Sequence, residues 1–107
     1  MTDGILGLLG QPTEQQRKLV AWNKARPIAG YDTGIWRVDD YGQIIKWSDY
    51  GLQTQYGWEI DHILPQSQFP AKADQPSNLR ALHWQNNRVK SDNIDSTGLS
   101  GLLRGLL

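Results

Sequence analysis

Four residues in the middle of the chain, Asp61, His62, Asn78 and Asn87, are of the types that metal-assisted hydrolysis uses. Histidine is the side chain whose charge changes near neutral pH, so His62 could take a proton from an attacking water. A hard divalent ion needs oxygen ligands, often only one or two from the protein, and it stabilises the charge that develops on a phosphodiester. Asp61 and Asn87 are therefore the candidate metal ligands.

Asp61 and His62 are neighbours in the segment WEIDHIL, residues 58–64, which predicts a strand that ends at Pro65. Adjacent residues of a strand point to opposite faces. The carboxylate would then face the metal while the imidazole reaches the water from another side.

Two further segments complete a predicted order of strand, loop, strand and helix. SNLRALH, residues 77–83, predicts a strand with Asn78 at its start, where the amide could hold the His62 ring or the loop around it. WQNNRVKSD, residues 84–92, predicts a short helix that brings Asn87 to the metal.

These segments together resemble the HNH endonuclease motif of colicin nucleases, homing endonucleases and RNA-guided nucleases. The sequences WEIDHILPQS and SNLRALHWQNNRVKSD carry the resemblance, which covers residues 58–93. It implies a ββα-metal core in which Asp61 and Asn87 bind the metal, His62 is the general base and Asn78 is the central Asn. It also implies hydrolysis of DNA phosphodiester bonds with one Mg²⁺ or Mn²⁺ ion, leaving 5′-phosphate and 3′-hydroxyl ends. Because one site is visible, we expect nicking.

Three departures from the motif bear on the site. The loop carries Phe69-Pro70-Ala71 where many members have Gly-Gly, which changes the loop and leaves the ligands in place. The chain has no cysteine, so the zinc site of some HNH proteins is absent and aromatic residues must stabilise the fold. Ser91 stands where colicin-type sites have a third metal His, which favours a magnesium-like site.

The distribution of charge gives a mixed indication of nucleic-acid binding. The chain has 11 basic and 11 acidic residues, which argues against tight autonomous binding to DNA. Residues 75–91 nevertheless contain three cations and no acid, namely Arg80, Arg88 and Lys90. These side chains could contact phosphates. The alternative is a solvated face with local ion pairs.

The remaining sequence predicts one α+β domain over residues 1–107. Residues 13–25 predict a helix, since Thr13 and Gln16 fit a capping box. Residues 28–57 are rich in turns and aromatic side chains, with a single short strand predicted at 44–47.

Both ends of the chain, residues 1–12 and 94–107, are rich in Gly and Leu. Leu99, Leu102, Leu103, Leu106 and Leu107 fall on one helical stripe. This stripe could pack on the domain, form a homodimer or another protein interface, or fray. With no cysteine, no signal peptide and no membrane-length apolar segment, we expect a cytoplasmic protein.

Two alternatives to a DNA endonuclease stay open at this stage. One is a nuclease that acts on RNA. The other is a catalytically idle HNH module that serves as a nucleic-acid or protein adaptor.

Overall fold

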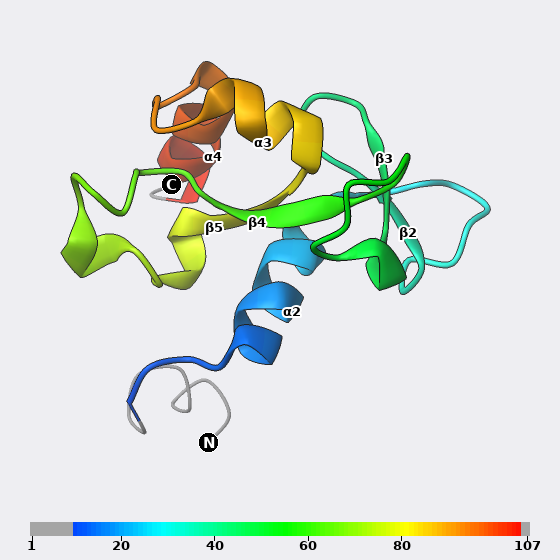
Figure 1. Cartoon of the computed structure of the whole chain (residues 1–107), viewed down its shortest axis with the longest axis horizontal. Helices are drawn as coiled ribbons and strands as arrows, with labels where there is room; N and C mark the ends of the chain where they lie inside the picture. Colours follow the sequence, from blue (N-terminus) through cyan, green and yellow to red (C-terminus); the bar gives the residue numbers. More distant parts are fainter. Residues whose placement is uncertain (1–9, 106–107) are drawn as a thin grey trace.

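This computed structural model describes residues 10–105, in which the first helix is α2 (Glu14–Lys24) (Figure 1). The predicted capping box is present: the Thr13 hydroxyl accepts from the Gln16 amide at 3.1 Å, and the Gln16 side chain accepts from the Thr13 amide at 2.8 Å. The helix ends at Lys24 and the backbone is extended from Ala25, because Pro27 follows and disfavours helical geometry in the residue before it.

The turn-rich leader contains a three-stranded antiparallel sheet of β1 (Arg26–Pro27), β2 (Trp36–Val38) and β3 (Ile44–Lys46), in that order. The sequence predicts only the last of these strands. The first two are so short that neither shows an alternating pattern. Trp47, which the sequence places in the strand, instead begins a short 3₁₀ helix (Trp47–Asp49).

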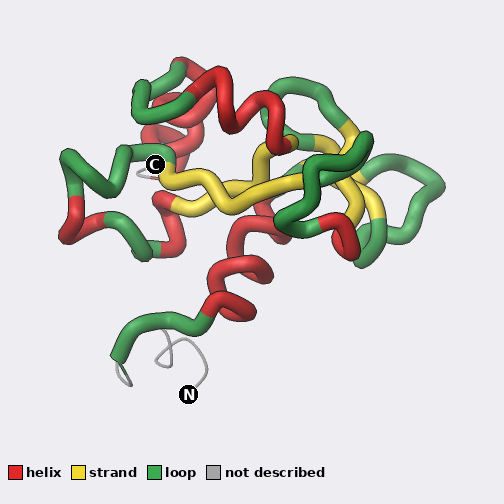
Figure 2. The backbone as a smooth tube through the Cα atoms, in the orientation of Figure 1, coloured by secondary structure: helices red, strands yellow, loops and turns green. Residues whose placement is uncertain are grey.

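The second sheet pairs β4 (Trp58–His62) with β5 (Leu79–His83), and α3 (Trp84–Lys90) follows β5 directly (Figures 1 and 2). The predicted order of strand, loop, strand and helix is therefore present. Asn78 differs from the prediction, because it ends a 3₁₀ turn (Pro76–Asn78) before β5.

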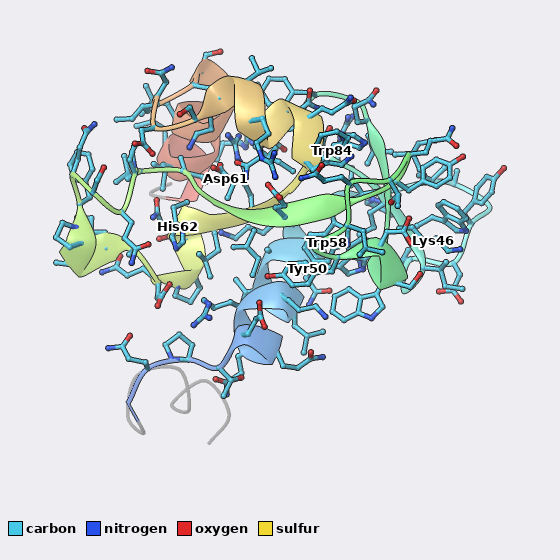
Figure 3. The ribbon with its side chains drawn as sticks, in the orientation of Figure 1. Lys46, Tyr50, Trp58, Asp61, His62 and Trp84 are labelled. Carbon is cyan, nitrogen blue, oxygen red and sulfur yellow. The ribbon has the colours of Figure 1, made fainter. Side chains whose placement is uncertain are left out.

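The core lies where α2 packs on β4 and β5, and α3 covers the opposite face of these strands (Figure 1). Trp58 is fully buried, with its ring 5.2 Å from that of Trp22 and 5.8 Å from that of Trp47. The Tyr50 ring packs on the Trp58 ring beside α2, with 4.9 Å between the ring centroids (Figure 3). Each such aromatic pair contributes roughly 0.5–1.5 kcal/mol beyond the area that it buries.

Asp39, which follows β2, is fully buried and joins the two sheets and α3. One carboxylate oxygen accepts from the backbone amides of Tyr41 and Gln43, each at 2.9 Å. The other accepts from the His83 amide at 3.0 Å and from the Asn86 side chain at 2.9 Å. Four hydrogen bonds compensate for burying the charge. We call these five residues the Asp39 cluster.

Helix α4 (Ser96–Gly105) carries the described part of the leucine stripe. Leu99 and Leu103 are 46% and 55% exposed, so packing of the stripe on the domain is wrong for these two residues. The helix approaches the domain through Gly98, which is buried. Residues 1–9, 106 and 107, and the predictions for them, lie outside the described residues. No helix within 10–105 has the length and apolar character that crossing a membrane requires.

Two glycines of α4 should respond in opposite ways to alanine. A Cβ on Gly98 would lie 2.6 Å from an Asp95 oxygen and 2.8 Å from an Ile63 methyl carbon, whereas one on Gly101 meets nothing closer than 3.8 Å. We expect Gly98→Ala to lower the free energy of unfolding by about 1–3 kcal/mol through overpacking. Gly101→Ala should raise it by about 0.5–1 kcal/mol, because alanine favours helix. Urea unfolding of both variants measures this, and equal effects would contradict the packing of α4 described here.

Candidate active site

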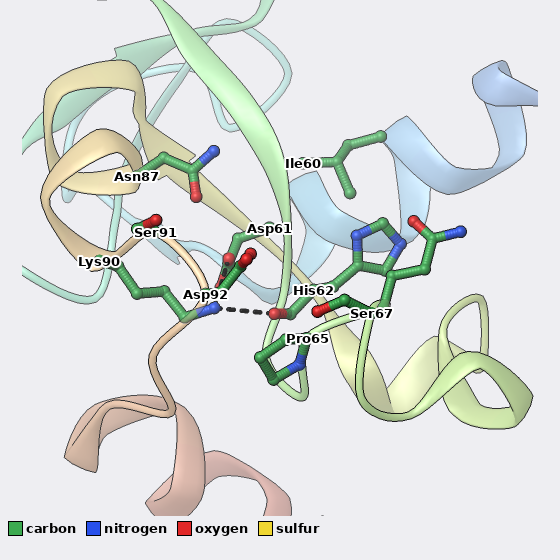
Figure 4. Close-up of a pocket in the computed structure, with 10 residues that line it drawn as sticks. Ile60, Asp61, His62, Pro65, Ser67, Asn87, Lys90, Ser91 and Asp92 are labelled. Atoms are coloured by element: carbon green, nitrogen blue, oxygen red, sulfur yellow. Dashed lines mark hydrogen bonds and ion pairs between the residues drawn. The ribbon is translucent and has the colours of Figure 1, made fainter.

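A pocket of about 280 Å³ lies at the end of β4, between the following loop and the end of α3 (Figure 4). Three of the four predicted site residues line it, namely Asp61, His62 and Asn87. Its other lining residues are Ile60, Pro65, Gln66, Ser67, Lys90, Ser91 and Asp92. These residues come from β4, the loop after it, α3 and the two positions that follow α3, so the succession of strand, strand and helix brings them together.

Asp61 is buried, 4% exposed, and both of its carboxylate oxygens are paired with cations. Nε of Arg80 donates to Oδ2 at 2.8 Å, and Nζ of Lys90 donates to Oδ1 at 2.8 Å. Asp61 and Arg80 are direct partners in the β4–β5 register. The Asp61 side chain is therefore held on the α3 side of the strand.

Arg80 is the centre of a buried charge cluster. Besides Asp61, its guanidinium donates to Asp40 at 2.8 Å, to Asp95 at 2.7 Å and to the Thr97 hydroxyl at 3.0 Å. We call these five residues the Arg80 cluster. Burial alone lowers the pKa of Arg80, but its bond to Asp95 and the charge of Asp61 outweigh burial and raise the pKa.

Two of the three cations proposed to contact phosphates are not on the surface. Arg80 and Lys90 have side chains only 4% and 2% exposed, because buried carboxylates hold them inside the domain. They form neither the basic face nor the solvated face that the sequence suggests. Arg88 is at the surface, 56% exposed, with Nη2 3.3 Å from Glu59.

His62 extends from the face of β4 opposite to Asp61 and reaches the same pocket near its edge (Figure 4). Its Nε2 lies 3.4 Å from Oδ1 of Asp74, in the loop between the strands. Asp74 is in turn 3.9 Å from Arg17 of α2. Within residues 10–105, no group bonds the other ring nitrogen, Nδ1. Asp74 is a loop carboxylate with no distinguishing neighbour in the sequence, so sequence reasoning missed it.

The side chains of Asn87 and Asn78 form hydrogen bonds with different parts of the site. The amide nitrogen of Asn87 donates to Glu59 at 2.9 Å, and the amide oxygen is turned toward the pocket (Figure 4). Asn78 is buried and bonds the backbone of Leu64 and Ala73, at 2.7 Å to the Leu64 amide. Of the two roles expected for Asn78, the structure has it holding the loop and not the His62 ring.

The side-chain oxygens at the pocket are ligands of the kind that a hard divalent ion requires. Oδ1 of Asp61 accepts one hydrogen bond and keeps a second lone pair, and the oxygen of Asn87 accepts none among the described residues. Asp92 adds a carboxylate at the pocket wall. No three His, Asp or Glu side chains within residues 10–105 are grouped as a metal site. An ion bound here would take its remaining ligands from water and substrate.

The chain matches no protein-family model, no curated protein and no solved structure. A function for the pocket must therefore be argued from its residues and from the resemblance of the sequence motif.

Asp95 should make stability depend on pH in the acidic range. Burial alone raises the pKa of Asp95, but hydrogen bonds from Arg80, Tyr41 and Thr97 lower it well below the usual 3.8. A lowered folded-state pKa means that the stabilisation is complete above about pH 4 and is lost as the pH falls further. At pH 7, where solvent at the cluster edge screens part of the interaction, Asp95→Asn should cost about 1–2 kcal/mol of unfolding free energy.

The difference between Asp95→Asn and wild type should shrink as urea unfolding is repeated from pH 5 toward pH 3. The control is Asp92→Asn, because Asp92 is exposed and outside the Arg80 cluster. A difference that stays constant over this range would contradict the lowered pKa.

Proposed function

We propose that the protein is a divalent-metal-dependent HNH endonuclease that hydrolyses DNA phosphodiester bonds. The observation that carries the proposal is the convergence of Asp61, His62 and Asn87 on one pocket from two elements. The resemblance of residues 58–93 to the HNH motif assigns these positions the same chemistry. The order of β4, β5 and α3 agrees with a ββα-metal core.

His62 is the general base in this proposal. Asp74 accepts from Nε2–H, which leaves Nδ1 unprotonated and able to take a proton from an attacking water. The 3.4 Å separation is long for a hydrogen bond, and we expect it to shorten when the imidazole becomes charged. Asp74 then acts as a positioning residue that fixes the tautomer and stabilises the imidazolium.

Asp61 and Asn87 would hold one Mg²⁺ or Mn²⁺ ion through their oxygens, with Glu59 orienting the Asn87 amide. When bound, the ion would stabilise charge on the leaving 3′ oxygen and the non-bridging phosphate oxygens. Arg88, exposed on α3, is the remaining cation of the predicted three that could contact a neighbouring phosphate.

One observation favours a second candidate, a catalytically idle HNH module that binds nucleic acid or protein. Both Asp61 oxygens accept hydrogen bonds from cations, which is also how a structural carboxylate would be held. Metal binding separates the two candidates, since an adaptor needs no ion.

Cleavage of supercoiled plasmid is the direct test. With Mg²⁺ or Mn²⁺ we expect conversion to open circle, and none with EDTA. His62→Ala should lower the rate by about 10²–10⁴-fold, the usual contribution of a general base. No cleavage with either metal, while a single-stranded RNA is cut, would move the proposal to an RNA nuclease. No cleavage of either substrate, or cleavage unchanged in His62→Ala, would leave the adaptor.

Asp74→Asn tests the positioning of the base. We expect kcat to fall by about 10–100-fold, as for other residues that orient a functional side chain, with KM and Mn²⁺ affinity unchanged. Asp74→Glu should recover part of the loss. Asp49→Asn is the matched control, because Asp49 bonds Thr54 away from the pocket. A fall in melting temperature that accounts for the lost activity would assign Asp74 a structural role only.

A further inference from the structure

Lys90 places a buried ammonium group beside the proposed metal ligands. Its side chain is 2% exposed, and Nζ donates to Oδ1 of Asp61 and to the backbone oxygen of His62, each at 2.8 Å (Figure 4). Lys90 itself lines the pocket. The cation therefore contacts the same carboxylate oxygen that an incoming ion would use.

The charges around the pocket show what this contact does. Asp61 carries one negative charge and meets two positive charges, those of Arg80 and Lys90. The other carboxylates bound to Arg80, Asp40 and Asp95, do not line the pocket. Asp92 is the one further acid among the lining residues. Lys90 cancels one of the two negative charges on the lining residues, those of Asp61 and Asp92, so the wall that would receive a divalent cation keeps only one net negative charge before substrate arrives.

We propose that Lys90 makes binding of the divalent ion depend on the nucleic acid. In the free protein the ammonium balances Asp61 and repels the ion, so the affinity for metal is low. A phosphodiester in the pocket brings the negative charge and the oxygen ligands that the protein lacks, and both restore the affinity. The ion and the substrate then bind cooperatively. This inference rests on the proposed function, because it takes Asp61 and Asn87 as metal ligands.

Binding of Mn²⁺, followed by electron paramagnetic resonance of the free ion, tests the proposal without turnover. All proteins carry His62→Ala so that a DNA duplex stays intact. With Lys90 present, duplex should tighten the apparent Kd for Mn²⁺ by about tenfold, within the usual range of coupling between two sites. Lys90→Met should tighten Mn²⁺ binding to the free protein by a similar factor. The effect of duplex should then fall below about threefold.

Two further variants separate charge from structure. Lys90→Arg keeps the charge and should retain weak binding of the free ion and the full effect of duplex. Lys72→Met removes one exposed positive charge outside the pocket, and should behave like the parent. If Lys90→Met does not fold by circular dichroism, Lys90→Gln replaces it, because the amide can still donate to the His62 carbonyl.

Two results would overturn the proposal in distinguishable ways. If wild type cleaves plasmid and Lys90→Met (or Lys90→Gln) leaves Mn²⁺ binding and its response to duplex unchanged, Lys90 only supports the strand end, and the proposed function stands. If no variant binds Mn²⁺ with or without duplex and wild type does not cleave, the metal site itself fails and both proposals fall.

Discussion

The buried guanidinium of Arg80 is the group on which the arrangement of the pocket depends most. It lies on β5, and its partners come from β4, from the loop after β2 and from the segment that begins α4. Taking such charges out of water is costly, and the cost is offset only when each donor meets an acceptor in good geometry. Every member of the Arg80 cluster is therefore constrained by the others. Asp61 lies where this balance requires a carboxylate.

The other proposed functional side chains of the pocket are also each held by a partner from a different element. Glu59 on β4 holds Asn87 on α3, and Asp74 in the loop contacts His62. Such partners fix orientation before a substrate arrives, so less conformational entropy is lost on binding. Most of the residues that line the pocket are polar, which suits the recognition of a charged, hydrated ligand.

Local patterns in the sequence predict the parts of this structure that depend on neighbouring residues. The capping box before α2 and the succession of strand, loop, strand and helix are of this kind. The strands β1 and β2 escape prediction because Arg26 pairs with Val38, across a turn-rich segment with no alternating pattern. Asp74 escapes because nothing local marks it as the neighbour of His62.

The sequence wrongly places Arg80 and Lys90 at the surface for a related reason. Counting charges between residues 75 and 91 gives no information about which way each side chain points. The pairing of Asp61 with Arg80 is a matter of register, which becomes visible only when both strands are aligned. Lys90 is the last residue of α3 and its side chain is buried against Asp61 of β4, while the Arg88 side chain lies at the surface. The same helix thus carries one buried cation, paired with Asp61, and one exposed cation, paired with Glu59.

The Asp39 cluster has a consequence for how the domain withstands its surroundings. A carboxylate with four protein donors joins the turn after β2 to the end of β5 and the start of α3. A link of this kind cannot be reduced, alkylated or removed by a chelator. The framework is thereby independent of the ion that the pocket is proposed to bind. Loss of the ion would abolish the proposed activity without unfolding the domain, so the same molecules would regain activity as soon as the ion returned.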